Sequence, residues 1–509
     1  MAVAGRIKKG AYFDSVALMR VGRELTAKPG VVDAAVVMAT AANKSILKES
    51  GLLIPLFKQT GDSDLLIVVK ARDGKSVIQA LDEAENILGK TAKPSSTGTE
   101  IVAGSLEGAA KILPGANMAL ISIAGRYAAA EAMKALKRGL HVMLFSDNVS
   151  LEQEIELKKF ARAKSLLVMG PDCGTAIING VPLAFANKVR RGQIGIVAAA
   201  GTGLQEVSTI ISNEGEGVSQ AIGTGGRDVK KDVGGIMFIE GLKALAADDG
   251  TKVILLVSKP PHKDVLNRIA KVIRSIRKPV VKMFIGADSK EGPATLEEAA
   301  HMAVALSKGE NPTEALNRLG LRDEDIAKRA KRLASKRKKG RKYVRGLFSG
   351  GTFCAEAQIL FGDLLKEVYS NAPTGKAKPL KNSLKSQKNT VVDLGEDEFT
   401  VGRPHPMIDF TLRNKRILEE AADPQTAVIL LDVVLGYGSH MDPAAELIPV
   451  IRRAAKNVQV VCSVTGTVED PQHEDRVTSA LKRAGAIVMP SNAAACKLAG
   501  AMAKELNRR

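Results

Sequence analysis

Residues 194–206 have the sequence IGIVAAAGTGLQE, and this stretch decides the fold class. Apolar residues run without interruption from 194 to 200, as in a strand that is buried on both faces. Gly201-Thr202-Gly203 then provides a turn, and an amphipathic helical pattern follows. A buried strand, a glycine turn and a helix form the unit from which parallel α/β sheets are built. The stretch therefore predicts an α/β protein with parallel sheets.

The same alternation of strand and helix extends in both directions from this stretch. Helical segments such as YAAAEAMKALKRG (127–139) separate short apolar runs. Ligands of such sheets bind outside the carboxyl ends of the strands, so we expect the functional loops there. The apolar runs predict strands at 117–124, 141–147, 165–170, 193–200, 218–225, 252–259 and 279–286, and then at 345–350, 427–436, 459–466 and 485–490.

The length of 509 residues allows about three domains. Residues 1–95 predict a small α/β domain, and a Pro/Ser/Thr/Gly-rich linker covers 91–100. The βαβ pattern then predicts domains over 101–192, 193–335 and 346–509, with a basic linker at 336–345 between the last two. An insert at about 366–410 has poor periodicity, and we expect it to be irregular.

The positive charge is concentrated in two short segments. Lys and Arg number 74 against 55 Asp and Glu, which gives a net charge of +19. Residues 328–345 and 375–388 hold sixteen basic residues and no acidic one, so the rest of the chain is close to neutral. Blocks of like charge are typical of solvated linkers. Because aromatic residues make up only 3%, base-stacking recognition is disfavoured, and we expect no nucleic-acid partner.

Several other classes of protein are disfavoured. No run of 18 apolar residues predicts a membrane span, and residues 1–15 lack the apolar core of a signal peptide. The four cysteines lie far apart without a CxxC spacing, and the six histidines form no HExxH pair. These features predict a cytoplasmic protein without a metal site and without a membrane partner.

Three glycine loops follow strands in the first half of the chain. At Gly201-Thr202-Gly203, backbone N–H groups at a helix start can bind an anion, and the alternative is a tight turn capped by the threonine. In the loop 223–228, Arg227 can bind a phosphate or carboxylate, or form a surface pair with Asp228. In the loop 170–175, Cys173 has no neighbouring histidine and is more typical of packing than of catalysis. The candidate binding residues are Asp172, Cys173, Gly174, Gly201, Thr202, Gly203, Gly225, Gly226 and Arg227.

The last domain repeats this arrangement and adds a histidine. Ser349-Gly350-Gly351-Thr352 precedes a helix and can be an anion site or a plain helix cap. His405 lies between two prolines on a stiff, non-helical segment. With Asp409 and Arg413 it can form an acid/base or anion-binding group, and the alternative is an ordered loop held by the prolines.

These loops carry a resemblance to a known family. Together they resemble the FdrA proteins along essentially the whole chain, and FdrA in turn is similar to succinyl-CoA synthetase. Residues 117–335 look like most of its α subunit, and residues 346–509 look like the carboxyl-terminal domain of its β subunit. The segments that carry the resemblance are VVMATAANK (36–44), GPDCGT (170–175), VPLAFANKVRRGQIGIVAAAGTGLQE (181–206), AIGTGGRDV (221–229), VGRPHPMIDFTLRN (401–414) and LLDVVLGYG (430–438).

The resemblance implies a Rossmann-like CoA-binding type of domain at 101–192 and flavodoxin-like domains at 193–335 and 346–509. It places GPDCGT, AAAGTG and SGGT around a phosphate and carboxylate site. The α subunit carries phosphate on a histidine in a Gly-His-Ala-Gly loop, whereas the corresponding segment here, GADSKEGPATLEEAAHMAVA (286–305), has no such histidine. The ATP-grasp domain of the β subunit has no counterpart in the chain either.

A phosphate site without a phosphate shuttle or an ATP module indicates transfer in place of ligation. The resemblance therefore implies phosphate-dependent carbamoyl or acyl transfer, of the oxamate carbamoyltransferase type, in ureide breakdown. Phosphate is the expected co-substrate, CoA is an alternative ligand, and partner subunits or further copies of the chain are expected. One alternative is an acyl-CoA synthetase that uses the ATP module of a partner. Another is a ligand-sensing or scaffold protein without catalysis.

Overall fold

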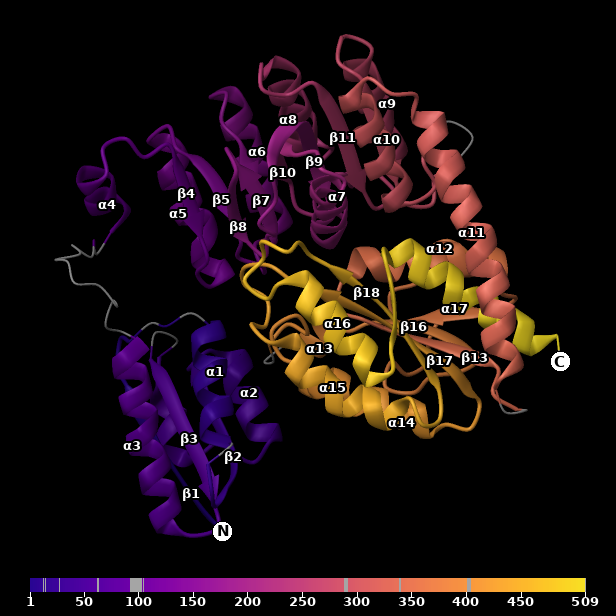
Figure 1. Cartoon of the computed structure of the whole chain (residues 1–509). Helices are drawn as coiled ribbons and strands as arrows, with labels where there is room; N and C mark the ends of the chain where they lie inside the picture. The colour runs from indigo at the N-terminus through magenta and orange to yellow at the C-terminus, as the bar shows by residue number, and fades with distance from the viewer. Residues whose placement is uncertain are drawn as a thin grey trace. The chain divides into compact units, whose positions relative to one another are not determined.

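The computed structural model describes the chain in two compact units. Residues 12, 14, 27, 62, 63, 92–102, 104, 288–291, 338, 339, 401–403 and 509 are not described. One unit contains Met1–Pro114 and Asp397–Pro404, and the other contains Gly115–Glu396 and His405–Arg509 (Figure 1). Apart from Thr91, the predicted linker at 91–100 lies outside the described residues. The four-domain division with boundaries near 95, 192 and 335–345 stays a prediction.

The first unit is a small α/β domain, as expected. Its antiparallel sheet has the strand order β1 (Ala2–Lys8), β3 (Leu65–Ala71) and β2 (Val31–Met38). Alternate residues of β3 point to opposite faces. Leu65, Ile67 and Val69 pack in one core with α1 (Ser15–Thr26) and α3 (Gly74–Thr91), whereas Leu66 and Val68 pack in another with α2 (Ala41–Glu49) and the short helix η1 (Pro55–Gln59). The helix α4 (Leu106–Ile112) follows.

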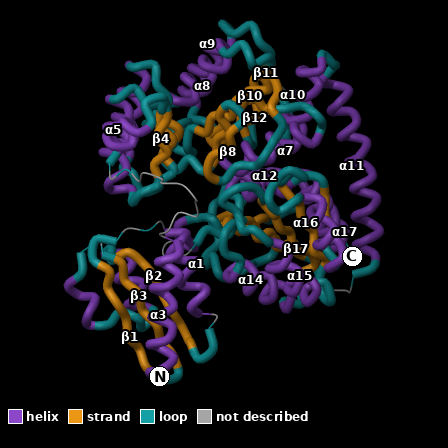
Figure 2. Tube along the Cα trace, turned by 60° about the vertical axis from the view of Figure 1, so that its left-hand side comes forward, coloured by secondary structure: helices purple, strands orange, loops and turns teal. Residues whose placement is uncertain are grey.

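The second unit begins with two sheets whose parallel strands confirm the predicted fold class. The first sheet has the order β4 (Met118–Ile121), β5 (His141–Leu144), β6 (Val168–Met169), with helices α5 (Gly125–Lys137) and α6 (Leu151–Ala163). The next sheet contains the parallel strands β12 (Val280–Phe284), β11 (Val253–Ser258), β9 (Arg191–Ala199) and β10 (Val218–Gly223), in that order (Figure 2). Its helices are α7 (Gly201–Asn213), α8 (Ile236–Ala247), α9 (Lys263–Ile273) and α10 (Leu296–Lys308).

This six-stranded sheet ends in a hairpin that the sequence analysis did not predict. The strands β7 (Thr175–Ile178) and β8 (Val181–Ala184) pair with each other, and β7 pairs with β10, all antiparallel. Asn179 and Gly180 join them with φ angles of 53° and 79°. Asn-Gly between two short apolar runs is a strong signal for a two-residue hairpin turn, so the sequence did contain the information.

The last sheet has seven parallel strands, and the supposedly irregular insert supplies three of them. Its order is β15 (Lys378–Pro379), β14 (Val368–Ser370), β16 (Asn389–Asp393), β13 (Tyr343–Phe348), β17 (Thr426–Val434), β18 (Gln459–Thr465), β19 (Ile487–Met489). The expectation of an irregular 366–410 was wrong, because β16 is short and its neighbours β14 and β15 are shorter still, so no periodicity develops. The helices are α12 (Gly351–Leu364), α13 (Asp397–Thr400), α14 (Thr411–Ala422), α15 (Pro443–Ala454), α16 (Glu474–Ala484) and α17 (Asn492–Asn507).

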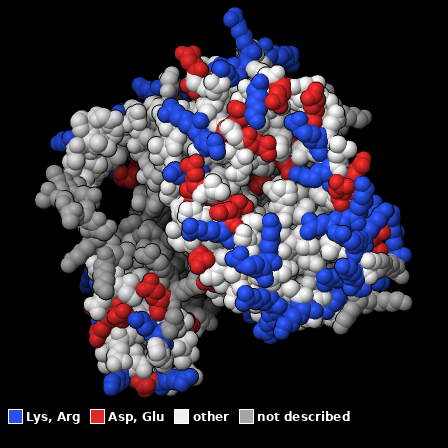
Figure 3. All heavy atoms as spheres, in the orientation of Figure 1, with Lys and Arg blue, Asp and Glu red and all other residues white. Residues whose placement is uncertain are grey.

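The basic segment is more ordered than a solvated linker. Helix α11 (Pro312–Ser335) contains its first part, with Lys328, Lys331 and Arg332 exposed. The view in Figure 3 shows Lys and Arg gathered at this side of the molecule. At the other end of the segment, Arg345 belongs to β13 and is buried, with ion pairs to Glu420 and Asp423 at 3.1 and 2.8 Å. The segment 336–345 is therefore not a free linker, because it ends inside the sheet.

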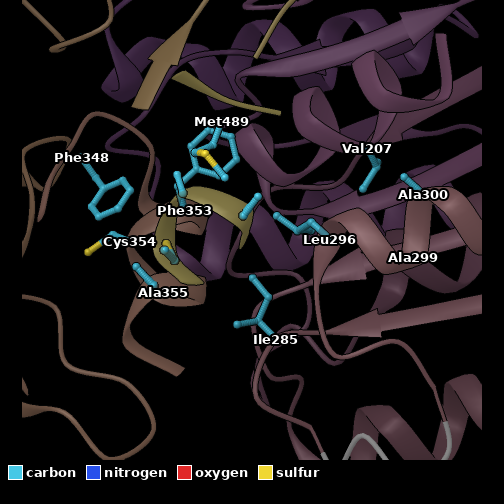
Figure 4. Packing of buried hydrophobic residues seen from close by; sticks show 14 of the residues in the cluster. Val207, Ile285, Leu296, Ala299, Ala300, Phe348, Phe353, Cys354, Ala355 and Met489 are labelled. Atoms are coloured by element: carbon cyan, nitrogen blue, oxygen red, sulfur yellow. The ribbon is translucent and has the colours of Figure 1, made fainter. Parts of the chain in front are cut away.

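One hydrophobic core joins the second and third sheets of this unit. It combines buried side chains of α7, α10, α12 and α17 with those of β9, β13 and β17. Figure 4 shows part of it, with Val207 of α7, Leu296 of α10, and Phe353 of α12. The helices α7 and α12 therefore pack against each other in a fixed arrangement.

Both of these sheets present the point where the strand order reverses. The chain leaves β9 toward β10 and later returns to place β11 on the other side of β9. In the last sheet it leaves β13 toward β16 and later places β17 on the other side of β13. Ligands of open α/β sheets bind at such points, at the carboxyl ends of the strands. The starts of α7 and α12 lie at these two points.

Candidate functional site

The amino-terminal ends of α7 and α12 face each other at close range. A Cβ on Gly203 would lie 2.8 Å from Cγ2 of Thr352, and a Cβ on Gly350 would lie 2.8 Å from Oγ1 of Thr202. A real Cβ does not tolerate such distances, so both positions need glycine for the helices to approach. The structure therefore brings together two glycine motifs that lie about 150 residues apart in the sequence.

Both helix ends keep donors available for an anion. Neither Ala200 nor Gly350, the residues that precede α7 and α12, forms a side-chain cap. Thr202 is 8% exposed, and within the described part of the chain its Oγ1 is buried without a hydrogen-bond partner. An unpaired buried hydroxyl is costly, and uncapped N–H groups carry the positive end of the helix dipole. This combination favours a bound anion.

A small pocket lies beside the start of α7. Six of the predicted binding residues line it, and its volume is about 30 Å³, enough for a small oxyanion and far too small for CoA. Cys173 lines it but is buried, and burial raises the pKa of its thiol to about 12. The thiol is therefore no nucleophile at neutral pH. The six predicted residues are Asp172, Cys173, Gly174, Gly201, Gly225 and Gly226.

Two neighbouring glycines of the pocket offer a matched pair of substitutions. A Cβ on Gly225 would lie 2.4 Å from the Pro171 carbonyl oxygen, and the φ of 79° is unfavourable for any side chain, whereas Gly226 has open space around it. We expect Gly225→Ala to lower the free energy of unfolding by about 1–3 kcal/mol or more, because strained backbone adds to the clash. Gly226→Ala should change it by less than about 0.5 kcal/mol. Urea denaturation of both variants measures this, and equal effects would contradict the assigned geometry.

Arg227 was expected to bind an anion, but its guanidinium is engaged elsewhere. It donates to the Val149 carbonyl oxygen at 2.9 Å and forms an ion pair with Glu154 of α6 at 2.8 Å. Next to it, Lys158 of α6 is fully buried and donates to Glu154, Asp228 and the Thr224 carbonyl oxygen, at 2.8, 2.8 and 3.0 Å. Arg227 therefore helps α6 to hold the loop 223–228 in place.

Ser349 and Arg413 meet at a carboxylate that the sequence analysis did not single out. Asp432 of β17 is fully buried and accepts the N–H and hydroxyl of Ser349 and the N–H of Gly350, each at 2.8 Å. Arg413 donates to Asp432 Oδ1 at 2.8 Å and also to the Asp432 carbonyl oxygen. Arg413 thus neutralises the carboxylate that shapes the start of α12, and neither side chain is free to bind a ligand.

His405, Asp409 and Arg413 were expected to act together, but the described contacts do not join them. Asp409 Oδ1 accepts the N–H of Thr411 at the start of α14. Nδ1 of His405 accepts the N–H of Met407 at 3.3 Å, and burial lowers the pKa of this imidazole to about 4. A neutral ring that accepts at Nδ1 carries its proton on Nε2. That atom lies 2.9 Å from the Cβ position of Gly395, and Asp393 Oδ1 lies 3.2 Å from the same position.

A second buried group, also missed from the sequence, joins α7, α12 and α17. Asn492 donates its backbone N–H to Glu206 at 2.8 Å and its side-chain amide to Glu356 at 2.7 Å. Thr465 donates to Glu206, and the N–H of Leu296 donates to Glu356. Burial raises the pKa of Glu206 to about 8 and that of Glu356 to about 7.

These two carboxyls predict a loss of stability at alkaline pH. Their ordinary pKa is 4.5, so the folded protein retains protons that the unfolded chain releases. Their contribution to stability is complete below about pH 4.5 and is lost as the pH rises through 7 and 8. We expect the free energy of unfolding to fall between pH 6 and pH 9, and Glu206→Gln to reduce this fall. Urea denaturation at several pH values tests it, with the exposed Glu156→Gln as control. An unchanged slope in Glu206→Gln would contradict the prediction.

The comparisons with known proteins agree on the class of fold. A family model described as CoA-ligase matches residues 347–502. The protein YahF of Escherichia coli is 42% identical over 97% of both chains. Succinate–CoA ligase subunit alpha-2 of Trichomonas vaginalis is 27% identical, over 41% of this chain and 68% of that one. The solved acetyl-coenzyme A synthetase 1 of Ca. Korarchaeum cryptofilum, in complex with phosphate and ADP, has a TM-score of 0.28 at 14% identity, over 77% of this chain and 83% of that chain.

A second family model, described as the AllF heavy metal-associated domain, matches residues 1–102. Heavy metal ions of the soft class prefer thiolate and imidazole ligands. This part of the sequence contains neither cysteine nor histidine, since the first histidine is His141 and the first cysteine is Cys173. Across the described residues, no group of three metal-binding side chains forms either. The residues do not fit a heavy metal ion, although the fold name implies one.

Two further findings concern the surroundings of the protein. No helix in the described ranges combines the length and apolarity that crossing a bilayer requires. All four cysteines are unpaired and buried.

Proposed function

The chain belongs to the same family as YahF of Escherichia coli, and from this premise we propose that it catalyses phosphate-dependent transfer of a carbamoyl or acyl group. The family match to CoA-ligase and the similarity to a succinate–CoA ligase α subunit support chemistry on an activated carboxyl group. The observation that carries the proposal is the pair of uncapped helix ends, with the buried unpaired hydroxyl of Thr202 between them. Such a site binds phosphate without a metal ion.

The proposed reaction needs positioning and charge stabilisation more than a covalent nucleophile. An oxygen of inorganic phosphate attacks the carbamoyl carbon of an N-carbamoyl substrate such as oxalurate. The C–N bond then breaks, the nitrogen takes up a proton, and the products are carbamoyl phosphate and oxamate. N–H groups at the starts of α7 and α12 stabilise the negative charge that develops on the carbonyl oxygen. We place this activity, as the FdrA resemblance suggests, in ureide breakdown and with partner subunits.

The experiment is a coupled assay of the full chain with the proteins encoded beside it. The mixture receives oxalurate and phosphate, and carbamoyl phosphate is measured. Its formation, dependent on this chain, is the expected result. Binding of phosphate without turnover would indicate a ligand-sensing or scaffold protein and would overturn the proposal.

The CoA-ligase match favours one alternative, an acyl-CoA synthetase that receives ATP chemistry from a partner. The pocket beside α7 has room for a small oxyanion but not for CoA, so the mechanism above does not use CoA. The same assay with a carboxylic acid, CoA and ATP separates the two functions. Thioester formation in place of carbamoyl phosphate would establish the alternative.

A further inference from the structure

One buried carboxylate beside this site has no assigned role. Asp393 is the last residue of β16 and is 3% exposed. Its backbone is fixed by Asn371, whose amide exchanges two hydrogen bonds with the Asp393 N–H and carbonyl, each at 2.9 Å. Its Oδ1 accepts the N–H of Gly395 at 2.9 Å. The carboxylate is therefore held in one orientation by the strand end and the following turn.

The other oxygen of Asp393 faces the start of α12. Oδ2 lies 2.6 Å from the Cβ position of Gly351, and Nζ of Lys259 lies 3.4 Å from the same position. Lys259 follows directly after β11, at the reversal point beside the start of α7. The adjacent glycine, Gly350, is the one that contacts Thr202. Asp393 and Lys259 thus lie within one residue of the contact between the two helix ends.

We propose that Asp393 is a catalytic residue that accepts the proton of the attacking phosphate and passes it to the leaving nitrogen. This inference rests on the proposed function. Phosphate that attacks as HPO₄²⁻ loses one proton when its new bond to carbon forms. The leaving nitrogen gains one proton when the C–N bond breaks. The two steps balance, so one carboxyl group completes the relay and returns to its starting form without any further reactant.

The surroundings of Asp393 suit a group that both accepts and donates. Burial raises the pKa of this carboxyl to about 7, against the opposing effect of the Lys259 charge. A proton relay works best when its pKa lies near the working pH. Lys259 offsets the repulsion between the carboxylate and a phosphate dianion. The other titratable groups that face Asp393 are Glu396 after β16, Asp432 of β17, Cys354 of α12 and His405.

The first test measures protons and does not depend on turnover. Calorimetry at pH 7 in two buffers of different ionisation enthalpy counts the protons taken up when inorganic sulfate binds, because sulfate itself does not titrate there. A bound dianion beside Asp393 raises the pKa of that carboxyl further, so we expect uptake of a substantial fraction of one proton. Asp393→Asn should abolish the uptake, and Asp393→Glu should restore part of it. The exposed Asp363→Asn, on the same helix α12, is the control. Uptake that persists in Asp393→Asn would overturn the inference.

The second test separates this inference from the proposed function. In the coupled assay with oxalurate and phosphate, Asp393→Asn should lower kcat about 10²- to 10⁴-fold, with little change in the KM for phosphate. The pH profile should also lose its change near pH 7. Carbamoyl phosphate formed by Asp393→Asn at the wild-type rate overturns the role of Asp393 alone. No carbamoyl phosphate from the wild-type chain overturns the proposed function and the relay with it.

Discussion

Lys158→Met is expected to lower the free energy of unfolding by about 3–5 kcal/mol, because it leaves buried carboxylates without their partner. Lys158, Glu154 and Asp228 are all fully buried, and both acids bond to the lysine at 2.8 Å. Asp228 also accepts the N–H of Phe238 at 2.7 Å, so it connects the start of α8 to the same cluster. Only Arg227 would remain to balance two negative charges.

The matched control is Lys159→Met, one residue further along α6, where the side chain is exposed. It should change stability by less than about 0.5 kcal/mol. Urea denaturation followed by circular dichroism measures both variants. A Lys158→Met protein as stable as the wild type would show that the cluster is not needed to hold the loop 223–228. If Lys158→Met does not accumulate as folded protein, Lys158→Arg keeps the charge and should recover folding in part.

Thr202→Val is expected to weaken binding of inorganic phosphate about 10- to 150-fold, with little loss of stability. A hydrogen bond to a charged group contributes about 1.5–3 kcal/mol, and each 1.4 kcal/mol corresponds to a factor of ten in the dissociation constant. Valine has nearly the same shape as threonine, and Oγ1 has no partner to lose among the described residues. Calorimetric titration with phosphate measures the change.

Thr202→Ser keeps the hydroxyl and should bind phosphate within about threefold of the wild type, because only a methyl group is removed. This pair of variants separates the hydrogen bond from the packing against Gly350. Unchanged affinity in Thr202→Val would exclude the start of α7 as the phosphate site. Equal losses in both variants would show that the methyl group, and not the hydroxyl, is what matters.

Much of the second unit could be predicted from periodicity. The long apolar runs around β9, β11 and β17 are buried on both faces, and their hydrophobicity identifies them without tertiary information. The strand β16 was missed because it has five residues, and β14 and β15 are shorter still. These strands gain their stability from pairing with neighbours, a contribution that a local pattern does not contain.

The candidate site was predicted in part. The glycine loops at 201–203 and 350–351 could be recognised because a strand, a glycine turn and a helix start recur in sequence order. Asp393, Lys259 and Asp432 carry no such pattern, since each is a single polar residue at or near a strand end. For Arg227 and Arg413 the residue type suggested an anion partner, but the partners turned out to be carboxylates of the protein itself.

The sequence by itself determined the parallel α/β architecture and the positions of the anion-binding loops, because both follow from local periodicity and from the conformational freedom of glycine. Only the tertiary structure decided which loops meet. Facing helix ends, buried ion pairs and a carboxyl with a raised pKa arise from contacts between residues far apart in the chain, and burial sets the strength of those contacts. The pairing of Thr202 with Gly350 is such a contact, and the proposed phosphate chemistry depends on it.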